Sequence, residues 1–303
     1  MHGMGVVSQF CENISIDSVV IKPEEKSGKT CSAWADILHF SGCRGMIDIN
    51  NCFLSAANDD AINVHGTYLK IIEKLFAKQI KVRFMHNQTY GFDAFKAGDS
   101  VDFIHPASLL SFGKNLITAT KKLNDKEILL TLQKPVPSDS LNDAVVENIS
   151  WTPQVRIQNT TITKIPTRGI LVTTRRKVII ENCTFQRVHS NAVLVEDDAA
   201  SWYESGMVKD LTIRKNNFVE CGEPVISIHP ENKVNQGAVH QNISIINNKF
   251  ILNDAIAMSA QNVSNISFSG NEIKTRAVVN INGLIEVKDC QNVTLSDNKI
   301  LLK

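Results

Sequence analysis

The sequence predicts an all-β protein, a right-handed parallel β-helix with a small antiparallel β-barrel or sandwich inserted into it. Three observations predict this fold. A strand-like phrase recurs eight times along the 303 residues, most copies are followed by a second apolar run, and longer alternating strands interrupt the series once. Internal periods of roughly 20 to 50 residues are typical of solenoids, in which each repeat forms one coil stacked on the next.

The repeated phrase reads Asn, apolar, x, apolar, x, Asn or Gly, Asn, x, Phe or Ile. Successive copies lie 23 to 33 residues apart, except across one large gap between Phe53 and Ile162. The alternating Val and Ile residues predict strands, and the flanking Asn and Gly residues predict turns. The Asn before the terminal Phe or Ile should face inward, bond its amide to the next coil and tolerate left-handed backbone. The copies are "ENISIDSVVI" (12–21), "CRGMIDINNCF" (43–53), "PQVRIQNTTI" (153–162), "RKVIIENCTF" (176–185), "KDLTIRKNNF" (209–218), "QNISIINNKF" (241–250), "SNISFSGNEI" (264–273) and "QNVTLSDNKI" (291–300).

A second short apolar run follows most copies and supplies a further strand to each coil. These runs are also short, alternating and bounded by Gly or Asp, which again favours strands over helices. Stacked coils of this kind would pair as parallel strands about 4.8 Å apart. The runs are "AINVHG" (61–66), "GILVTT" (169–174), "AVLVED" (192–197), "PVISIH" (224–229), "AIAMSA" (255–260) and "GLIEVK" (283–288).

The region between residues 67 and 150 breaks the pattern. It contains the longer alternating runs "KQIKVRFMH", "DSVDFIHP", "NLITATKKL" and "EILLTLQKPV", with turns expected at Gly91, Gly98 and Asn124-Asp125. Such a meander favours an inserted antiparallel barrel or sandwich. We therefore expect the first part of the β-helix over 1–66, the inserted domain over 67–150 and the second part of the β-helix over 151–303.

Composition excludes several classes of partner. The chain is 43% hydrophobic and 21% charged, which allows a large core, and its formal net charge is only +1 with the basic residues scattered. Nucleic acid and anionic membrane surfaces are therefore not expected partners. No stretch approaches the roughly 18 apolar residues needed to insert into a membrane. Whether the chain forms a homo-oligomer is left open.

The seven cysteines are few and far apart, with no CxxC or Cys/His cluster to suggest zinc or a redox pair. We interpret most of them as small buried core residues. The N-terminal "MHGMGVVSQF" lacks the basic and apolar regions of a signal peptide, so the chain does not encode its localisation. Neither end shows an evident cap, which would leave strand edges exposed.

Three aspartates are the candidate catalytic residues. Aligning "ADILHFSG" (35–42) with "DDAINVHG" (59–66) places Asp36 over Asp60, 24 residues and one coil away, with Asp59 beside it. Carboxylates this close should titrate as a coupled set. Hydrolysis of a glycosidic bond with inversion uses one protonated carboxyl as acid and a second carboxylate to activate water.

Two other interpretations of these acids stay open. Asn58-Asp59-Asp60 is also good turn chemistry, because short Asx side chains bond their own backbone. Clustered acids on a β-helix can bind calcium as well, although no dense D-x-D or Gly-Asp repeat supports it. A non-catalytic carbohydrate-binding β-helix and a calcium-assisted polysaccharide lyase are therefore the alternative functions.

Several long stretches around these residues resemble glycoside hydrolase family 110, the bacterial α-1,3-galactosidases that act on blood-group-B-type and linear α-galactosyl termini. The similarity covers essentially the whole chain, including "FMHNQTYGF" of the insert. The stretches are "HGMGVVSQFCENISID", "WADILHFSGCRG", "NDDAINVHGTYL", "TRGILVTTRRKVIIENCTF", "VLVEDDAASWYESGMVKDLTIRKNNF" and "PVISIHPEN".

The resemblance implies an exo-acting, inverting glycosidase without metal or organic cofactor, whose partners are galactose-terminated glycans. Like the polygalacturonases, the family uses three aspartates on a β-helix. The resemblance implies that Asp59 is the general acid and that Asp36 and Asp60 position and deprotonate the water. The polygalacturonase Gly-His-Gly and Arg-x-Lys elements have no clean counterpart, which suits a neutral hexose. Family members are about twice as long and begin with a secretion signal, so the resemblance implies N-terminal truncation and a secreted or periplasmic bacterial protein.

Further residues are candidate substrate contacts. Arg168 aligns one coil beyond Asp60, and His65 follows the aspartate pair; each could touch a sugar hydroxyl or be purely structural. Asp197 and Asp198 form a second pair without a stacked third acid, so we expect a loop role for them. The remaining candidates lie in "VEDDAASWYESG" and "ISIHPEN": Trp202 for stacking on galactose, Glu196 and Glu204 for its hydroxyls, and His229 and Glu231 at the rim.

Overall fold

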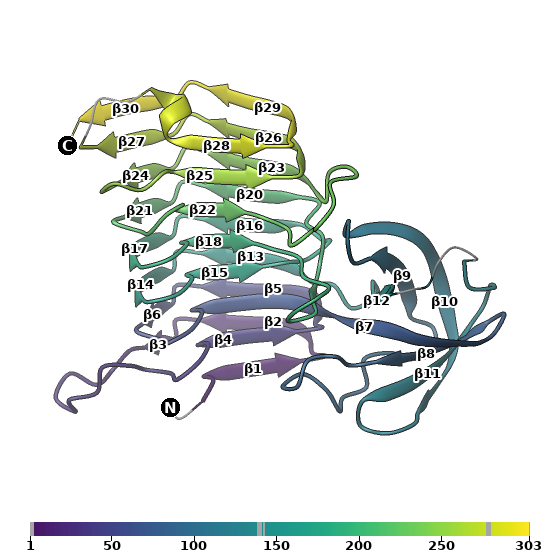
Figure 1. The fold of residues 1–303 in the computed structure, drawn as a ribbon. Coiled ribbons are helices and arrows are strands. Elements are labelled where there is room, and N and C mark those ends of the chain that lie inside the picture. Colours follow the sequence, from purple (N-terminus) through teal and green to yellow (C-terminus); the bar gives the residue numbers. More distant parts are fainter. Residues whose placement is uncertain (1–2, 138–140, 142, 277–279, 303) are drawn as a thin grey trace.

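The structure is a computed structural model that describes residues 3–137, 141, 143–276 and 280–302. It is a stack of parallel coils with a barrel attached to one side near the N-terminal end (Figure 1). The coils form three parallel sheets, each coil contributes one strand to each sheet, and the antiparallel barrel strands continue one of them. Within those residues no helix has the length and apolar character to cross a membrane. The expected right-handed β-helix class is confirmed.

The repeated phrase provides two of the three sheets. Its first half forms one sheet and its terminal Phe or Ile lies in another, so the chain turns a corner inside each copy. The first of these sheets consists of β2 (Glu12–Asp17), β5 (Arg44–Asn50), β13 (Gln154–Gln158), β16 (Val178–Glu181), β20 (Leu211–Arg214), β23 (His240–Ile246), β26 (Val263–Ser269) and β29 (Gln291–Ser296). The second consists of β3 (Val20–Ile21), β6 (Phe53–Ser55), β14 (Thr161–Ile165), β17 (Thr184–Val188), β21 (Asn217–Val219), β24 (Lys249–Ile251), β27 (Glu272–Thr275) and β30 (Lys299–Leu302).

The second apolar run of each coil forms the third sheet, which carries the candidate site. A short 3₁₀ turn, η1 (Ile281–Gly283), precedes its last strand. The parallel strands of this sheet are β1 (Val6–Gln9), β4 (Leu38–Ser41), β7 (Ile62–Phe76), β15 (Ile170–Val172), β18 (Val193–Val195), β22 (Ile226–Ile228), β25 (Met258–Gln261) and β28 (Ile285–Lys288).

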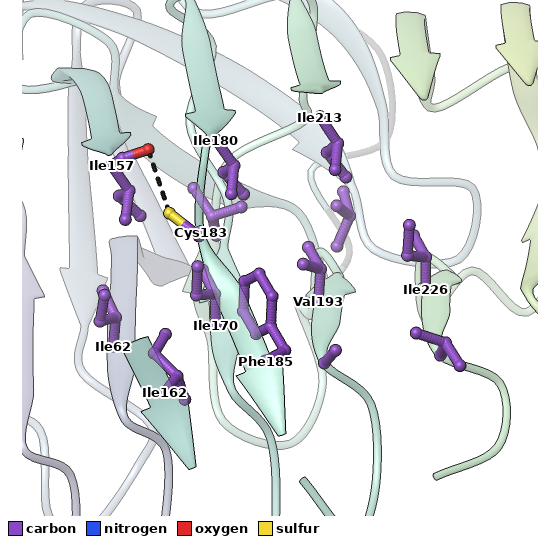
Figure 2. Close-up of a cluster of buried hydrophobic side chains, with 14 of the residues drawn as sticks. Ile62, Ile157, Ile162, Ile170, Ile180, Cys183, Phe185, Val193, Ile213 and Ile226 are labelled. Carbon is purple, nitrogen blue, oxygen red and sulfur yellow. Dashed lines mark hydrogen bonds between the residues drawn. The ribbon is translucent and has the colours of Figure 1, made fainter. Parts of the chain in front are cut away.

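Apolar side chains fill the β-helix from coil to coil. Ile157, Ile180 and Ile213 repeat at equivalent positions, and the Cys183 thiol donates to the Ile157 carbonyl (Figure 2). Phe185, Phe218 and Phe250 stack with ring centroids 4.9 and 4.8 Å apart. Because equivalent positions of successive coils carry apolar residues, one continuous core forms.

A ladder of asparagine amides bonds successive coils inside this core. The Asn248 Oδ1 accepts from the backbone and side-chain amides of Asn216, each at 3.0 Å, and Asn271 repeats the arrangement toward Asn248. The left-handed residue is the one before the ladder position, such as Asn247 with φ 56°. The expected inward amide and the left-handed backbone thus belong to neighbouring residues. In earlier coils, Cys52, Thr160 and Cys183 take the ladder position.

The insert closes into an antiparallel barrel. Strand β7 leaves the β-helix without a break at Gly66 and pairs with β8 (Gln79–Arg83). The order then runs through β11 (Glu127–Leu132), β10 (Leu110–Lys122), β9 (Ser100–His105) and β12 (Val145–Asn148), and β12 returns to pair with β7. Of the two architectures expected, the barrel is the one formed. The division at residues 66 and 150 stays a prediction.

Buried charge joins the barrel to the β-helix. Arg175, which follows β15, forms ion pairs with Glu147 of β12 and with Asp102 of β9, the latter at 2.8 Å. Asp102 is 0% and Glu147 1% exposed. Tyr68 and Val145 pack nearby in a small apolar cluster shared by both parts. The barrel is thereby fixed against the coils that carry the site.

The cysteines are free thiols, and all seven lie in the described residues. Cys43, Cys52, Cys183 and Cys221 are buried in the β-helix, whereas Cys11 is exposed. This agrees with a packing role for most of them.

Candidate active site

A pocket of about 360 Å³ lies on the sheet that contains β4, β7 and β15. The lining comes from the first three coils, including the turn that contains Asp59 and Asp60 and the segment 168–173, from the barrel loop 88–92, and from the loop 196–204 that follows β18. Its size is within the range of ligand pockets. A concave, polar site is therefore formed jointly by the β-helix and the barrel.

The three candidate aspartates meet in this pocket. Leu38 pairs with Ile62, and the Ile37 amide donates to the Asp60 carbonyl, so Asp36 stacks one coil from Asp60 as expected from the alignment. One oxygen from each of Asp36, Asp59 and Asp60 lies within 4.8 Å of the others. Asp36 and Asp60 are buried, whereas the side chain of Asp59 is 45% exposed.

Arg168 balances part of this negative charge. It precedes β15 on the next coil, where its carbonyl accepts from the Ala61 amide. Its guanidinium donates to both oxygens of Asp60, at 2.5 and 3.1 Å, and to Asp59 at 3.1 Å. A bidentate pair of this kind is among the strong charge-assisted hydrogen bonds, and it favours the ionised form of Asp60.

Burial and charge separate the roles of the acids. Burial, and then the charge of Asp36, raises the pKa of Asp59, which favours a protonated carboxyl. Burial also raises the pKa of Asp60, to about 8, although the Arg168 hydrogen bonds oppose the shift. Burial acts against the charged form of Arg168, yet the hydrogen bond and charge of Asp60, with the charge of Asp59, raise the guanidinium pKa. Asp59, with its raised pKa and its half-exposed side chain, is thus the acid best placed to pass a proton into the pocket.

Two histidines extend the site away from Asp36. The Nδ1 of His39 lies 2.7 Å from Asp36 Oδ2, and its Nε2 lies 3.2 Å from the Nε2 of His65. The Nδ1 of His65 lies 2.6 Å from the Gly66 carbonyl oxygen. Burial lowers the pKa of His65. His65 therefore faces another histidine within a buried chain of hydrogen bonds, and Glu204 lies 3.6 Å from its Nε2.

The loop 196–204 is held in place by the second aspartate pair. Asp198 accepts from the backbone amides of Ala200, Ser201 and Trp202. Asp197 is fully buried and accepts from the Tyr68 hydroxyl at 3.2 Å. Both residues also line the pocket, but the hydrogen bonds of their carboxylates lie within the fold, which agrees with the loop role expected from the sequence.

The same loop brings an aromatic ring to the pocket rim. Trp202 is 52% exposed and packs on the barrel residue His86, with ring centroids 4.4 Å apart. Behind it, Glu204 and Ser205 form β19 (Glu204–Ser205), which pairs with β7 so closely that a Cβ at Gly66 would lie 2.4 Å from Ser205 Oγ. Glycine is needed there to let the two strands approach.

Most of the residues predicted from the sequence line one pocket. The structure brings Asp36, Asp59, Asp60, His65, Arg168, Glu196, Trp202 and Glu204 together. His229 and Glu231 do not line the pocket. The Nε2 of His229 lies 2.8 Å from the Oγ of Ser259 on the next coil. The charge of Glu231 contributes to the raised pKa of Glu196. Contact of these two with sugar stays a prediction.

Sequence reasoning missed His39 and the barrel wall. The wall comprises Gln88, Thr89, Tyr90 and Phe92. The only sequence signal for His39 was its position three residues after Asp36 in "ADILHFSG". No periodicity marks the barrel wall, because the barrel loop lies outside the repeat.

Two family models match the chain. The right-handed β-helix region matches residues 144–301, about half of the chain, and the GLAA-B β-barrel domain II matches residues 79–146. Together with the stacked coils and the carboxylate pocket, the match defines the class: the chain belongs to the right-handed β-helix family.

Individual relatives of the chain are named α-1,3-galactosidase A or B, and the resemblance expected from the sequence is confirmed. The chain is 50% identical over 271 residues to α-1,3-galactosidase A of Akkermansia muciniphila, covering 89% of this chain and 46% of the relative. It is 44% identical over 308 residues to α-1,3-galactosidase A of Bacteroides thetaiotaomicron, covering 100% and 54%. The α-1,3-galactosidase B of the same organism is 34% identical over 312 residues, covering 98% and 51%. The chain spans about half the length of the curated relatives it matches.

Proposed function

We propose that this chain carries the catalytic centre of an exo-acting glycoside hydrolase that removes terminal α-1,3-linked galactose from blood-group-B-type or linear glycans, with inversion. One observation carries the proposal: Asp36, Asp59 and Asp60 converge in a pocket of a chain that is up to 50% identical to α-1,3-galactosidases. The proposal covers substrate, stereochemistry and the activity of this half-length chain.

Each side chain has a role that its surroundings support. Asp59, half-exposed and with a raised pKa, donates a proton to the leaving glycosidic oxygen. Asp60 and Asp36 orient a water molecule and accept its proton. Trp202 stacks on the apolar face of the galactose, and Glu204 accepts from its hydroxyls. Polar contacts to the sugar also come from Glu196, Arg168 and His65, which line the pocket.

The spacing of the acids makes the product anomer the decisive measurement. The nearest oxygens lie within 4.8 Å of one another, closer than the about 6.5–9.5 Å usual for inverting enzymes and near the about 5–5.5 Å of retaining ones. We still propose inversion, because Asp60 has Arg168 hydrogen bonds on both oxygens and Asp36 has His39 on one. Such engaged carboxylates suit binding a water molecule better than attacking carbon.

The test is to incubate the protein with a Galα1-3Gal disaccharide, with and without EDTA, and to follow the anomer of the released galactose by NMR. We expect β-galactose first, no effect of EDTA, and a loss of about a thousandfold or more in Asp59→Asn, since general acid catalysis contributes about 10²–10⁴-fold. Initial α-galactose would overturn the inverting assignment.

A calcium-assisted lyase is the second candidate, because the same three oxygens could hold a hard cation. A lyase would also need a Lys or Arg base beside the acids, and Arg168 is the residue of that kind that contacts them. The charges of Asp60 and Asp59 hold Arg168 in its protonated form, which does not suit a base. Loss of activity with EDTA and an unsaturated product would favour the lyase.

A further inference from the structure

A chain of three short contacts runs from the candidate base Asp36 into the protein. Asp36 Oδ2 faces His39 Nδ1 at 2.7 Å, His39 Nε2 faces His65 Nε2 at 3.2 Å, and His65 Nδ1 faces the Gly66 carbonyl at 2.6 Å. The side chains of Asp36 and His65 are 6% and 3% exposed, and that of His39 is 13% exposed. Water therefore has little room to replace any of these partners.

The atoms in the chain fix how many protons it holds. A carbonyl oxygen can only accept, so the contact with Gly66 requires a proton on His65 Nδ1. Two ring nitrogens can share a hydrogen bond only if one of them carries a proton, so the contact between His39 and His65 requires a second. The contact between His39 and Asp36 requires a third. Two neutral imidazoles supply two protons, and the third is additional.

The groups around the chain place the additional proton at the Asp36 end. Burial lowers the pKa of His65, which disfavours a second proton on that ring. Glu204 of β19 lies 3.6 Å from His65 Nε2, beyond hydrogen-bond length. On the other side, Asp59 and Asp60 lie within 4.8 Å of Asp36, with Arg168 bound to both.

The neighbouring strand β1 contributes no charge to this balance. It pairs with β4 and carries only uncharged side chains, Val6 to Gln9, next to His39. The charges that face the chain are therefore those of the carboxylates and Arg168 already described.

We propose that His39 is a positioning residue, and that Asp36, His39 and His65 together hold one proton more than an ionised carboxylate and two neutral imidazoles. The hydrogen bond from His39 occupies Asp36 Oδ2 and leaves Oδ1 to meet water. The extra proton and Arg168 offset two of the three carboxylate charges, so the acids can crowd together without all being protonated. The catalytic consequence of this arrangement rests on the proposed galactosidase function.

The first test reads the protons directly and requires no turnover. Histidine labelled with ¹⁵N is incorporated, and two-bond ¹H–¹⁵N spectra report which nitrogens of each ring carry protons; His39→Asn and His65→Asn assign the two rings. Near neutral pH we expect His65 protonated at Nδ1 only and His39 protonated at Nε2. His65 protonated only at Nε2, or His39 without a proton on Nε2, would overturn the proposal even in a chain that cleaves no sugar.

The second test measures catalysis. In His39→Asn the amide can still donate to Asp36 but cannot titrate. We expect kcat/KM to fall about tenfold and the pH profile to change, because the extra proton is lost with the ring while the general acid Asp59 remains. In His39→Ala we expect a loss of about a hundredfold, the size of effect that a misplaced catalytic group produces.

His189→Asn is the matched control, because this histidine is exposed and lies outside the pocket lining. It should leave both the rate and the pH profile unchanged. An unchanged kcat/KM and pH profile in His39→Asn would contradict the positioning role. A wild-type chain with the expected ring protons but no turnover would instead count against the proposed function.

Discussion

Asp60 depends on Arg168 more than on any other residue. It has no exposed surface, and both of its oxygens accept from the same guanidinium. Burying an ionised carboxylate is costly unless it is paired and hydrogen-bonded. The arginine thus stabilises the charge that the proposed mechanism uses.

Arg168→Met should destabilise the protein by about 3 kcal/mol near pH 10, since removing one partner of a buried pair leaves an uncompensated charge. Burial already raises the pKa of Asp60 to about 8 in the wild type, and the pKa of the unpaired Asp60 would lie higher still. The loss therefore develops above about pH 8 and disappears below about pH 6, where Asp60 is protonated in the folded state of both proteins. Urea unfolding at both pH values measures this. The exposed Arg176→Met is the control, and an equal loss at both pH values would contradict the prediction.

Glu196 provides a second test at the level of one side chain. Burial, and then the charge of Glu231, raises its pKa from 4.5 to about 7. The folded state therefore binds this proton more tightly than the unfolded state, so stability falls as pH rises from 4.5 to about 7 and stays reduced above it. Glu196→Gln should be more stable than the wild type above pH 7, by about 2 kcal/mol after allowing for its partial exposure.

Thermal unfolding across this pH range measures the effect of Glu196→Gln. The two proteins should be equally stable at low pH, where the glutamate is uncharged in both states. Exposed Glu24→Gln should show no such difference. A variant stabilised equally at all pH values would point to packing rather than charge.

At the level of the element, the coils are held by one repeated pair of interactions. Apolar side chains stack along each face, and asparagine amides bond coil to coil where the chain turns from the sheet of β20 to that of β21. The turn is made by the left-handed residue just before the ladder position, which explains why the sequence repeats Asn or Gly next to Asn.

Asn248→Ala should cost about 3 kcal/mol, because it leaves buried amides of Asn216 and the Ile213 carbonyl without their partners. Asn248→Cys should cost less, since Cys183 fills the equivalent position and its thiol donates to a carbonyl one coil away. Chemical denaturation of both variants measures the difference. Asn247→Gly, at a positive φ, is the control and should change stability by only a few tenths of a kcal/mol.

At the level of the whole molecule, the barrel is part of the site as well as an insertion. It contributes the wall 88–92 and His86, against which Trp202 packs. Its position on the β-helix depends on the buried ion pairs of Arg175. Pocket shape and barrel docking are therefore coupled.

Arg175→Met should destabilise the protein by about 4 kcal/mol, because Asp102 and Glu147 would be left as buried, uncompensated charges. Under the proposed function, the affinity for galactose should fall with it as the barrel wall shifts. Combining Arg175→Met with Asp102→Leu and Glu147→Leu should recover most of the stability, since apolar side chains of similar volume can replace a buried ionic triad. Calorimetric unfolding and titration with galactose measure both effects. A triple variant no more stable than Arg175→Met would contradict this account.

Much of the fold and part of the site could be predicted because the chain repeats. The period located the strands, the ladder and the coil step, and that step placed Asp36 over Asp60. His39 could not be predicted as a site residue, because its role depends on a ring one strand away. The barrel wall could not be predicted either, because the direction of a long hairpin leaves no pattern in the sequence.

The sequence by itself determined the stacked coils and the three aspartates, because in a solenoid each residue lies beside its equivalent one repeat later. The tertiary structure decided which other side chains reach those aspartates. Arg168 meets Asp60 across 108 residues because the intervening barrel begins and ends on consecutive coils. His39 meets His65, and Trp202 meets His86, because side chains on neighbouring elements project toward the same space. The sequence period fixes which residues are neighbours along the stack of coils, whereas tertiary packing fixes which loop and barrel residues line the pocket above it.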